Sequence, residues 1–127
     1  MDKVVHFEIP VDDLERAKGF YSSVFGWGMQ TMGEEMQNYT IAMTTPVDEQ
    51  TRTPLEPGGI NGGLMRRGDP TPAPVLTIGV DSIDTSAKMI EAEGGSIVTP
   101  RTEIAGMGAF AYFKDSEGNV VGLWESH

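Results

Sequence analysis

Residues 4–27, VVHFEIPVDDLERAKGFYSSVFGW, decide the fold of this chain. The opening VVHFEIPV is rich in β-branched residues and alternates in polarity, which predicts a strand. Apolar residues then recur at helical spacing over residues 14–25, and Gly26 follows them as a C-terminal cap. Either Asp12 or Asp13 can cap the start of this helix. The stretch therefore predicts a strand followed directly by an amphipathic helix.

The predicted first strand has an apolar face and a polar face. We expect the helix to cover the apolar face, so that His6 and Glu8 look out onto solvent or a cavity. Neighbours on one face of a strand are ~7 Å apart, close enough for two polar groups to serve one site. The alternation places Val5, Phe7 and Ile9 on the apolar face and His6, Glu8 and Pro10 on the polar face.

The second half of the chain repeats this pattern. At an offset of 69 residues, Val11-Asp12 is matched by Val80-Asp81. The pattern predicts a second helix that is capped by Asp81 and ends at Gly94-Gly95. We therefore predict an α+β fold of two βαβββ modules in a single domain over 1–127, with module one at about 1–67 and module two at about 74–127. The expected later strands are 28–32, 39–44, 60–65, 75–80, 96–99, 110–114 and 120–124.

Composition excludes several classes of function. The formal net charge is −10, which argues against nucleic acid or an anionic membrane surface as a partner. Without cysteine there are no disulfides, thiol nucleophiles or CxxC zinc sites. The N-terminal residues show no signal-peptide pattern and no apolar run is long enough to span a bilayer, so we expect a cytoplasmic protein. Glycine is enriched, with 16 residues in 127.

Two segments are predicted to be loops. Residues 45–59 are rich in Pro, Thr and acids, and residues 104–108 precede a strand pattern; either is a candidate lid. The sequence GMGAFA at 106–111 formally fits a variant of the dinucleotide-binding fingerprint. That fingerprint must open a helix after a strand, whereas strand formers follow here, so we predict a loop.

Three segments together resemble the vicinal oxygen chelate superfamily, which includes glyoxalase I, bleomycin-resistance proteins and extradiol dioxygenases. They are 4–27, PGGINGGLM at 57–65 and FAYFKDSEGNVVGLWE at 110–125. The likeness is to the short glyoxalase-related branch. The resemblance implies two βαβββ modules that form a cup-shaped, mixed eight-stranded sheet with flanking helices, and a homodimer that pairs edge to edge.

The resemblance also implies four positions for ligands of a divalent metal, on the first and last strands of each module. They fall on His6, near Gly63, on Val75 and on Gly122. Only His6 can donate a lone pair, and Glu8 is the one nearby recruit, whereas a catalytic ion usually takes about three protein ligands. We therefore expect no metal and no other cofactor. Glycine at two of these positions is expected to enlarge the cup.

Other side chains of the predicted cup follow from strand parity. Trp124 shares a face with Gly122, and it either stacks on a ligand or plugs the cup. Tyr39 and Tyr112 either supply hydroxyls or pack at a core or sheet edge. The predicted ligand cup is lined by His6, Glu8, Gly63, Val75, Thr77, Gly122 and Trp124.

Three functions follow from these residues. The first is the binding of a small organic molecule in a metal-free cup. The second is a lyase, isomerase or dioxygenase that uses a divalent metal, or His6 and Glu8 as catalytic acid and base. The third is a structural or interaction role for the dimer, with a dry cup filled by side chains. The sequence does not name the ligand.

Overall fold

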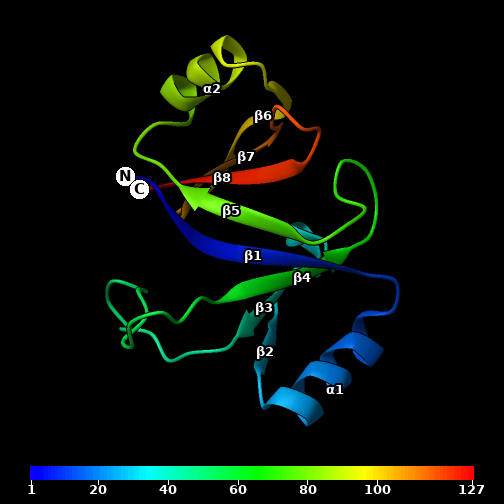
Figure 1. Ribbon diagram of the computed structural model, residues 1–127. Helices are drawn as coiled ribbons and strands as arrows, with labels where there is room; N and C mark the ends of the chain where they lie inside the picture. Colours follow the sequence, from blue (N-terminus) through cyan, green and yellow to red (C-terminus); the bar gives the residue numbers. More distant parts are fainter. The chain divides into compact units, whose positions relative to one another are not determined.

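The computed structural model describes all residues 1–127 of the chain (Figure 1). It contains two α-helices and eight strands, and the strands pair in both parallel and antiparallel fashion. The chain forms two compact units, one of residues 6–68 and 72–74 and one of residues 1–5, 69–71 and 75–127. The predicted α+β class and the two βαβββ modules are confirmed.

Module one has the strand order β2-β3-β4-β1. Strand β1 runs parallel to β4, while β2–β3 and β3–β4 are antiparallel. Every predicted element of this module is present, with small shifts at the ends. The elements are β1 (Lys3–Val11), α1 (Leu14–Phe25), β2 (Gly28–Thr31), a short 3-10 helix η1 (Glu34–Met36), β3 (Thr40–Met43) and β4 (Gly62–Arg66).

Helix α1 begins and ends as its sequence predicts. Of the two candidate caps, Asp13 is the one used, because its carboxylate accepts the backbone N–H of Arg16 at 3.0 Å. Gly26 follows the helix with φ 73°, a left-handed conformation that glycine adopts without strain. The helix contacts β2 and β4 (Figure 1), and none of its residues is buried.

The two faces of β1 are buried differently from the prediction. Val5, expected on the covered face, is 43% exposed, while Glu8 on the polar face is only 8% exposed. The apolar cover expected for Val5 is therefore wrong. At Glu8 the burial excludes the solvent-facing alternative, while the cavity alternative stays a prediction. Helix α1 contacts β2 and β4.

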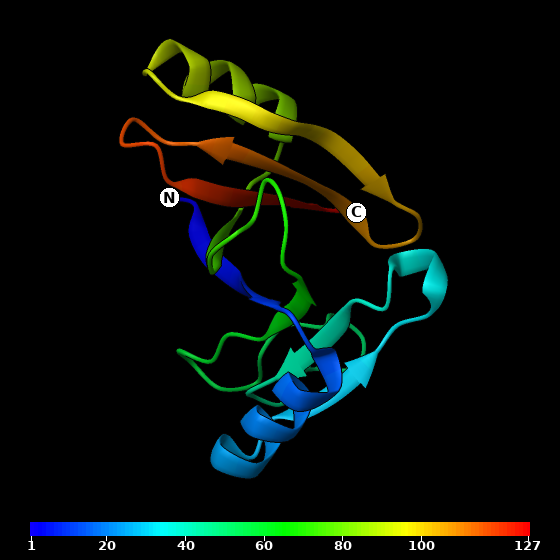
Figure 2. The same ribbon diagram turned by 90° about the vertical axis from the view of Figure 1, so that its right-hand side faces the viewer.

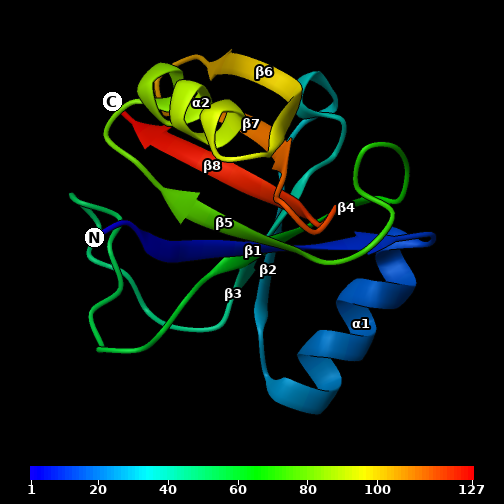
Figure 3. The same ribbon diagram turned by 45° about the horizontal axis from the view of Figure 1, so that its top comes forward.

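Module two has the strand order β5-β8-β7-β6, with β5 parallel to β8 and the other pairs antiparallel. Helix α2 lies along β6, β7 and β8 (Figures 2 and 3). The core of module two consists of Ile83, Ala109, Ala111, Phe113 and Leu123. The elements are β5 (Val75–Gly79), α2 (Ile83–Ala92), β6 (Ser96–Ile104), β7 (Gly108–Lys114) and β8 (Val120–Ser126).

Two predictions in module two are wrong. Helix α2 is capped by Ser82 and not by Asp81, since the Ser82 hydroxyl accepts the Thr85 N–H at 3.2 Å. Strand β6 continues to Ile104 instead of ending near Thr99. Its pairing with β7 shifts register on both sides of Thr99, and such bulges let a strand continue through a proline and a broken alternation.

Residues 45–59 are confirmed as irregular structure, whereas only residues 105–107 of the predicted 104–108 loop form a turn, because Ile104 ends β6 and Gly108 begins β7. The role of both segments as lids stays a prediction. Residues 45–59 contain no strand beyond one bridge between Val47 and Pro54. The base of this loop is fixed by Asn61, whose Oδ1 accepts the N–H of Thr44 at 2.7 Å. The segment after Ile104 is the turn between β6 and β7, not the start of a helix. No helix of the chain is long and apolar enough to cross a membrane.

Candidate functional site

The candidate site in module one centres on a hydrogen bond between His6 and Tyr39. The Nε2 atom of His6, on β1, lies 2.8 Å from the Tyr39 hydroxyl. Tyr39 immediately precedes β3, and its backbone carbonyl accepts the N–H of Met32 at 2.8 Å. The chain reaches this position through Gln37 and Asn38, both with positive φ, and asparagine tolerates that conformation better than most residues. A local turn thus positions the phenol against the imidazole.

His6 is neutral at physiological pH. Burial lowers the pKa of His6 from 6.5 to about 4, because an imidazolium would lose its hydration in this position. A neutral imidazole has one N–H donor and one acceptor nitrogen. With Nε2 engaged by Tyr39, the pair can act as a hydrogen-bond donor or acceptor toward a third group, and carries no net charge.

Glu8 and Gly63 lie next to this pair on the same face. Glu8 is opposite Gly63 in the parallel β1–β4 register, and Gly63 is opposite Ile41 on β3. Because successive side chains alternate, His6, Glu8, Tyr39 and Ile41 project from the same face of these strands. The Glu8 carboxyl is 8% exposed. Module one therefore gathers a carboxyl, an imidazole and a phenol on one face.

The space above Gly63 is filled. A Cβ at this position would overlap the Tyr39 hydroxyl and come within 2.6 Å of the Tyr39 Cε1. The prediction that glycine here enlarges the cup is therefore wrong, because the tyrosine side chain takes up the room. Gly63 instead allows Tyr39 to reach His6.

The predicted residues of module two lie together on β5 and β8. Val75 and Thr77 are 2% and 6% exposed, and Thr77 is opposite Gly122 in the parallel register. The Thr77 Oγ1 would be 2.7 Å from a Cβ at Gly122. As at Gly63, a neighbouring side chain fills the space and no enlargement results. Trp124 is half-buried and packs over Gly108, whose Cβ would meet its ring at 2.9 Å.

The residues present do not fit a divalent metal. No group of three or more His, Asp or Glu side chains is placed to hold an ion. Of the four positions that the resemblance implies, only His6 has a donor atom, and its Nε2 is engaged by Tyr39. Glycine and valine at the other three supply no lone pair.

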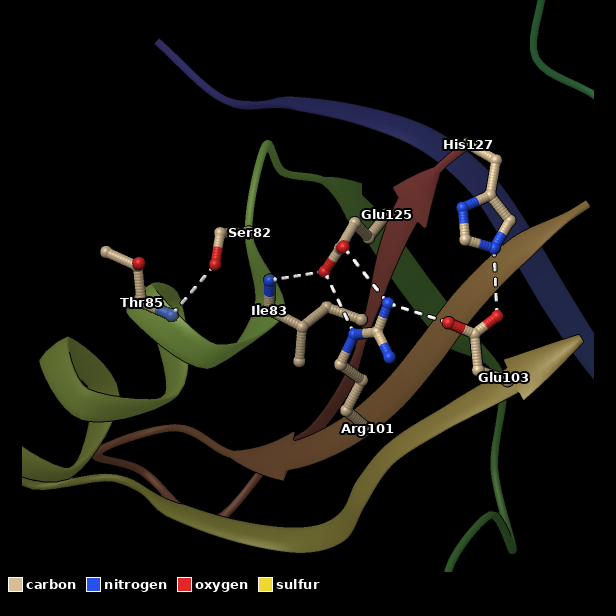
Figure 4. Close-up of polar contacts among 7 residues, drawn as sticks. All are labelled: Ser82, Ile83, Thr85, Arg101, Glu103, Glu125 and His127. Atoms are coloured by element: carbon tan, nitrogen blue, oxygen red, sulfur yellow. Dashed lines mark hydrogen bonds and ion pairs between the residues drawn. The ribbon is translucent and has the colours of Figure 1, made fainter.

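A second polar cluster, shown in Figure 4, holds helix α2 to its strands. The Glu125 carboxylate accepts the backbone N–H of Ile83 at 2.9 Å and pairs with Arg101, whose Nη2 lies 3.2 Å from Oε1. Arg101 also contacts Glu103, which is 2.8 Å from His127. The Arg101 hydrogen bond and then the Ile83 N–H lower the pKa of Glu125. Because both helix and strand groups meet at Glu125, this cluster is structural.

Sequence reasoning undervalued Tyr39. The sequence left two roles open for Tyr39, either to supply a hydroxyl or to pack at a core or sheet edge. Neither role linked it to His6. The signal was present in strand parity, because Tyr39 and Ile41 share a face and Ile41 pairs with Gly63. Only the register of β3 on β4 shows that the tyrosine crosses the glycine toward β1.

Comparison with known proteins shows what this chain is similar to. A model of the bleomycin resistance protein-like N-terminal family matches residues 3–45. A probable lactoylglutathione lyase of Vibrio parahaemolyticus is 27% identical over 123 residues, covering 95% of this chain and 88% of the relative. The putative glyoxylase CFP32 of Mycobacterium tuberculosis is 27% identical over 94% of this chain. The chain spans only 44% of the length of that relative.

Solved structures show the same fold. Methylmalonyl-CoA epimerase of Streptomyces coelicolor, in complex with 2-nitronate-propionyl-CoA, has a TM-score of 0.66 and 19% identity, over 98% of this chain and 96% of the epimerase chain. A methylmalonyl-CoA epimerase in complex with methylmalonyl-CoA and NH4+ has a TM-score of 0.68, also at 19% identity, over 99% and 95%. The family model, the glyoxalase-like relatives and the epimerase structures all point in the direction of the vicinal oxygen chelate superfamily as what this chain is similar to.

Proposed function

We propose that the chain binds a small organic molecule, without a metal, on the face of module one that carries His6, Glu8 and Tyr39. The observation that carries this proposal is the 2.8 Å hydrogen bond between a half-buried neutral imidazole and a phenol. A polar pair of this kind, set among apolar strand residues, is typical of the few fixed polar groups that orient a ligand. No group of three or more metal-ligating side chains gathers around His6, which supports binding without an ion.

The charge of this face indicates the class of ligand. None of its residues is a lysine or an arginine, and His6 is neutral at pH 7. An anionic ligand needs cationic partners, and the face offers none, so the ligand is neutral or cationic. By strand parity the face consists of Gly28 and Gln30 on β2, Tyr39, Ile41 and Met43 on or beside β3, Gly63 and Met65 on β4, and His6, Glu8 and Pro10 on β1.

This proposal is tested by titrating matched sets of neutral, cationic and anionic aromatic compounds of similar size by calorimetry. We expect binding among the neutral or cationic members and none among the anions. Tyr39→Phe should weaken binding about tenfold, the cost of one hydrogen bond to the ligand–histidine network. Tyr21→Phe, on helix α1 and outside this face, is the matched control and should bind normally. Equal weakening by the two variants, or preferential binding of anions, would contradict the proposal.

For module two we propose ligand contact by Trp124, with Val75, Thr77 and Gly122 as its neighbours on that face. The ring is half-buried, so part of it can still change environment when a ligand binds. The chain has 2 tryptophans, and Trp27→Phe leaves Trp124 as the one indole fluorophore. We expect the fluorescence of that variant to shift on saturation with a ligand found by calorimetry. An unchanged spectrum would remove Trp124 from the ligand contacts.

A second candidate function is metal-free acid–base catalysis by His6 and Glu8. The observation that favours it is the depressed pKa of His6 beside a buried carboxyl, since perturbed titratable groups gather at catalytic sites. In this role one residue would take a proton from the bound molecule and the other would return it. Once a ligand is identified, its turnover should be lost in His6→Gln and in Glu8→Gln, and should persist in excess chelator. Full turnover by both variants would exclude this function.

We also propose that the chain acts as a homodimer in the cytoplasm, as one domain, and without a nucleic-acid partner. The excess of acidic residues supports the last point. Light scattering on the purified protein tests the homodimer, cell fractionation tests the location, and a gel-shift assay with duplex and single-stranded oligonucleotides tests the statement on nucleic acid. A monomeric mass, a membrane-bound fraction or a shifted band would each contradict one of them.

A further inference from the structure

The 45–59 loop of module one is closed at its base by the side chain of Asn61. The Asn61 Oδ1 accepts the backbone N–H of Thr44 at 2.7 Å and that of Thr45 at 2.9 Å, while Nδ2 donates to the Thr45 carbonyl at 3.0 Å. The Thr44 hydroxyl adds a hydrogen bond to the Ile60 carbonyl at 2.6 Å. We call residues 44–45 and 60–61 the loop base. One amide side chain therefore makes three of these four hydrogen bonds across it.

The loop base also contains a buried hydroxyl that has no partner. Thr45 is 7% exposed, and its Oγ1 makes no hydrogen bond within the chain. A Cβ at Gly59 would come within 2.6 Å of this atom, so the hydroxyl is packed against the opposite end of the loop. A buried polar group without a partner destabilises the state that buries it. Opening of the loop base is therefore favoured by the access to water that this hydroxyl gains.

Asn61 is also the one asparagine of the chain that precedes a glycine. The other two, Asn38 and Asn119, are followed by larger residues. Asparagine is among the thermolabile residues, because the backbone nitrogen of the next residue can attack its side-chain carbonyl. Glycine leaves that nitrogen uncrowded, since it has no Cβ. The residue that closes the loop base is therefore also the most reactive asparagine of the sequence.

The reaction needs only water. The Gly62 nitrogen gives up its proton and attacks the Cγ of Asn61, so that an N–Cγ bond forms. The Cγ–Nδ2 bond then breaks, and ammonia leaves with that proton. Water opens the resulting cyclic imide at one of its two carbonyls and produces aspartate or isoaspartate. No group is oxidised or reduced, and the amide is not regenerated.

The folded strand opposes this attack. Gly62 is paired with Phe7 of β1 on one side and with Ala42 of β3 on the other. The Asn61 amide must leave its three hydrogen bonds before its Cγ can turn toward the Gly62 nitrogen. Loops open locally at a lower free energy than the whole fold. Reaction at Asn61 therefore requires the loop base to open, and the closed base protects it.

We propose that Asn61 is a site of spontaneous deamidation, which occurs when the loop base opens and leaves a product that no longer closes it. In the aspartate product an oxygen replaces Nδ2, so two acceptors face each other where Nδ2 now donates to the Thr45 carbonyl. The change is one-way and loosens the loop between β3 and β4. The inference is independent of the proposed ligand site, because it uses none of the residues on that face.

Peptide mass spectrometry of incubated protein measures the reaction. Trypsin releases residues 53–66 as a peptide whose only asparagine is Asn61. In urea-unfolded chain we expect Asn61 to be converted faster than Asn38 and Asn119. In the folded chain its conversion should be slower by about tenfold or more, because only the open loop base reacts. Equal rates at Asn61 in the folded and unfolded chain would contradict gating by the loop base.

Two variants separate opening of the loop base from unfolding of the whole chain. Thr44→Ala removes the hydrogen bond to Ile60 and should speed conversion of Asn61 in the folded chain about fivefold, the effect of one lost hydrogen bond on an opening equilibrium. Ser82→Ala, the matched control, removes a helix cap in module two and should leave that rate unchanged. Equal acceleration by both variants, or no conversion in folded Thr44→Ala, would refute the proposal.

The variant Asn61→Asp tests the effect of the product on the loop. Arg52 is exposed in the middle of the loop, and brief trypsin treatment of the folded protein should cleave after it several-fold faster in Asn61→Asp than in wild type. Asn119→Asp, which adds the same charge in module two, is the matched control and should be cleaved like wild type. Circular dichroism shows that both variants are folded. Unchanged cleavage in Asn61→Asp would overturn the claim that deamidation releases the loop.

Discussion

At the scale of single residues, Tyr39 and Gly63 form one unit. The tyrosine crosses the glycine to reach His6, so the absence of a side chain at Gly63 is a condition for that hydrogen bond. Glu8 and Ile41 are the strand neighbours of Gly63 and lie on the same face. The chemistry of the candidate site therefore depends on a residue that has no functional group.

Gly63→Ala is expected to destabilise the fold by about 1–3 kcal/mol, the usual cost of overpacking a filled space. The added methyl must displace the Tyr39 ring, which also separates Tyr39 from His6. Urea denaturation measures the change in the free energy of unfolding. Gly68→Ala is the control, because a Cβ there meets no atom within 4 Å. Equal stability of the two variants would show that Tyr39 does not occupy this space.

Protonation of His6 is expected to make stability depend on pH. The pKa of His6 is about 4 in the folded chain and 6.5 as a model value, so the unfolded chain binds the proton more tightly. Stability is therefore highest above pH 6.5 and falls as the pH drops from 6.5 toward 4, by up to about 3 kcal/mol.

The measurement is the free energy of unfolding across this range for wild type and for His6→Gln. The glutamine variant retains the hydrogen-bonding group and lacks the titration, so its curve should be flatter between about pH 5 and pH 6.5. The lowered pKa values of Asp48, Glu103, Asp115 and Glu125 act at lower pH and are shared by both proteins. Parallel curves would show that His6 titrates normally in the folded state.

The sequence was sufficient to select His6 and Glu8, and insufficient to describe their surroundings. Strand alternation depends only on neighbouring residues, so it correctly put the two side chains on one face. The burial of Glu8 and the contact with Tyr39 depend on which strands flank β1 and in what register, which is set by contacts distant in sequence. The same reason explains why the space at Gly63 and Gly122 was misjudged.

At the scale of elements, the start of α2 shows how two adjacent polar residues compete for one cap. Asp81 and Ser82 are both good N-cap residues, and the helix pattern alone does not choose between them. The structure uses Ser82, and Glu125 of β8 supplies a further acceptor to the Ile83 N–H. The acceptor from β8 fixes where the helix begins.

Ser82→Ala should therefore cost about 1 kcal/mol of stability, the usual value of a lost cap, while Asp81→Ala should cost little. Thermal unfolding followed at the helix signal by circular dichroism distinguishes the two variants. A larger loss for Asp81→Ala would mean that the helix starts one residue earlier than it does here.

The elements that sequence predicted best are those with strong local periodicity. The helix α1 and the strand β1 carry complete amphipathic or alternating patterns, and both were found within one residue of their bounds. Strand β6 was cut short because Pro100 and the charged residues after Val98 break the alternation. Bulges restore its pairing with β7, and a bulge is a property of two strands together.

At the scale of the molecule, the net charge of each copy opposes formation of the proposed homodimer. Each copy carries a formal charge of −10, so association brings two like-charged bodies together. Salt does not screen apolar attraction between the copies, whereas it screens the overall repulsion over a Debye length.

We therefore expect the dimer to tighten as salt is raised from about 20 mM to about 300 mM, by several-fold in Kd, because the Debye length shrinks across this range. Sedimentation equilibrium at the two salt concentrations measures it, with Arg16→Gln and Glu15→Gln as paired variants that shift the net charge by one in opposite directions. At low salt, the Glu15→Gln dimer should be tighter than the wild-type dimer, and the Arg16→Gln dimer should be weaker than it. A dimer that weakens with salt would show that ion pairs, and not apolar contacts, are the principal source of its affinity.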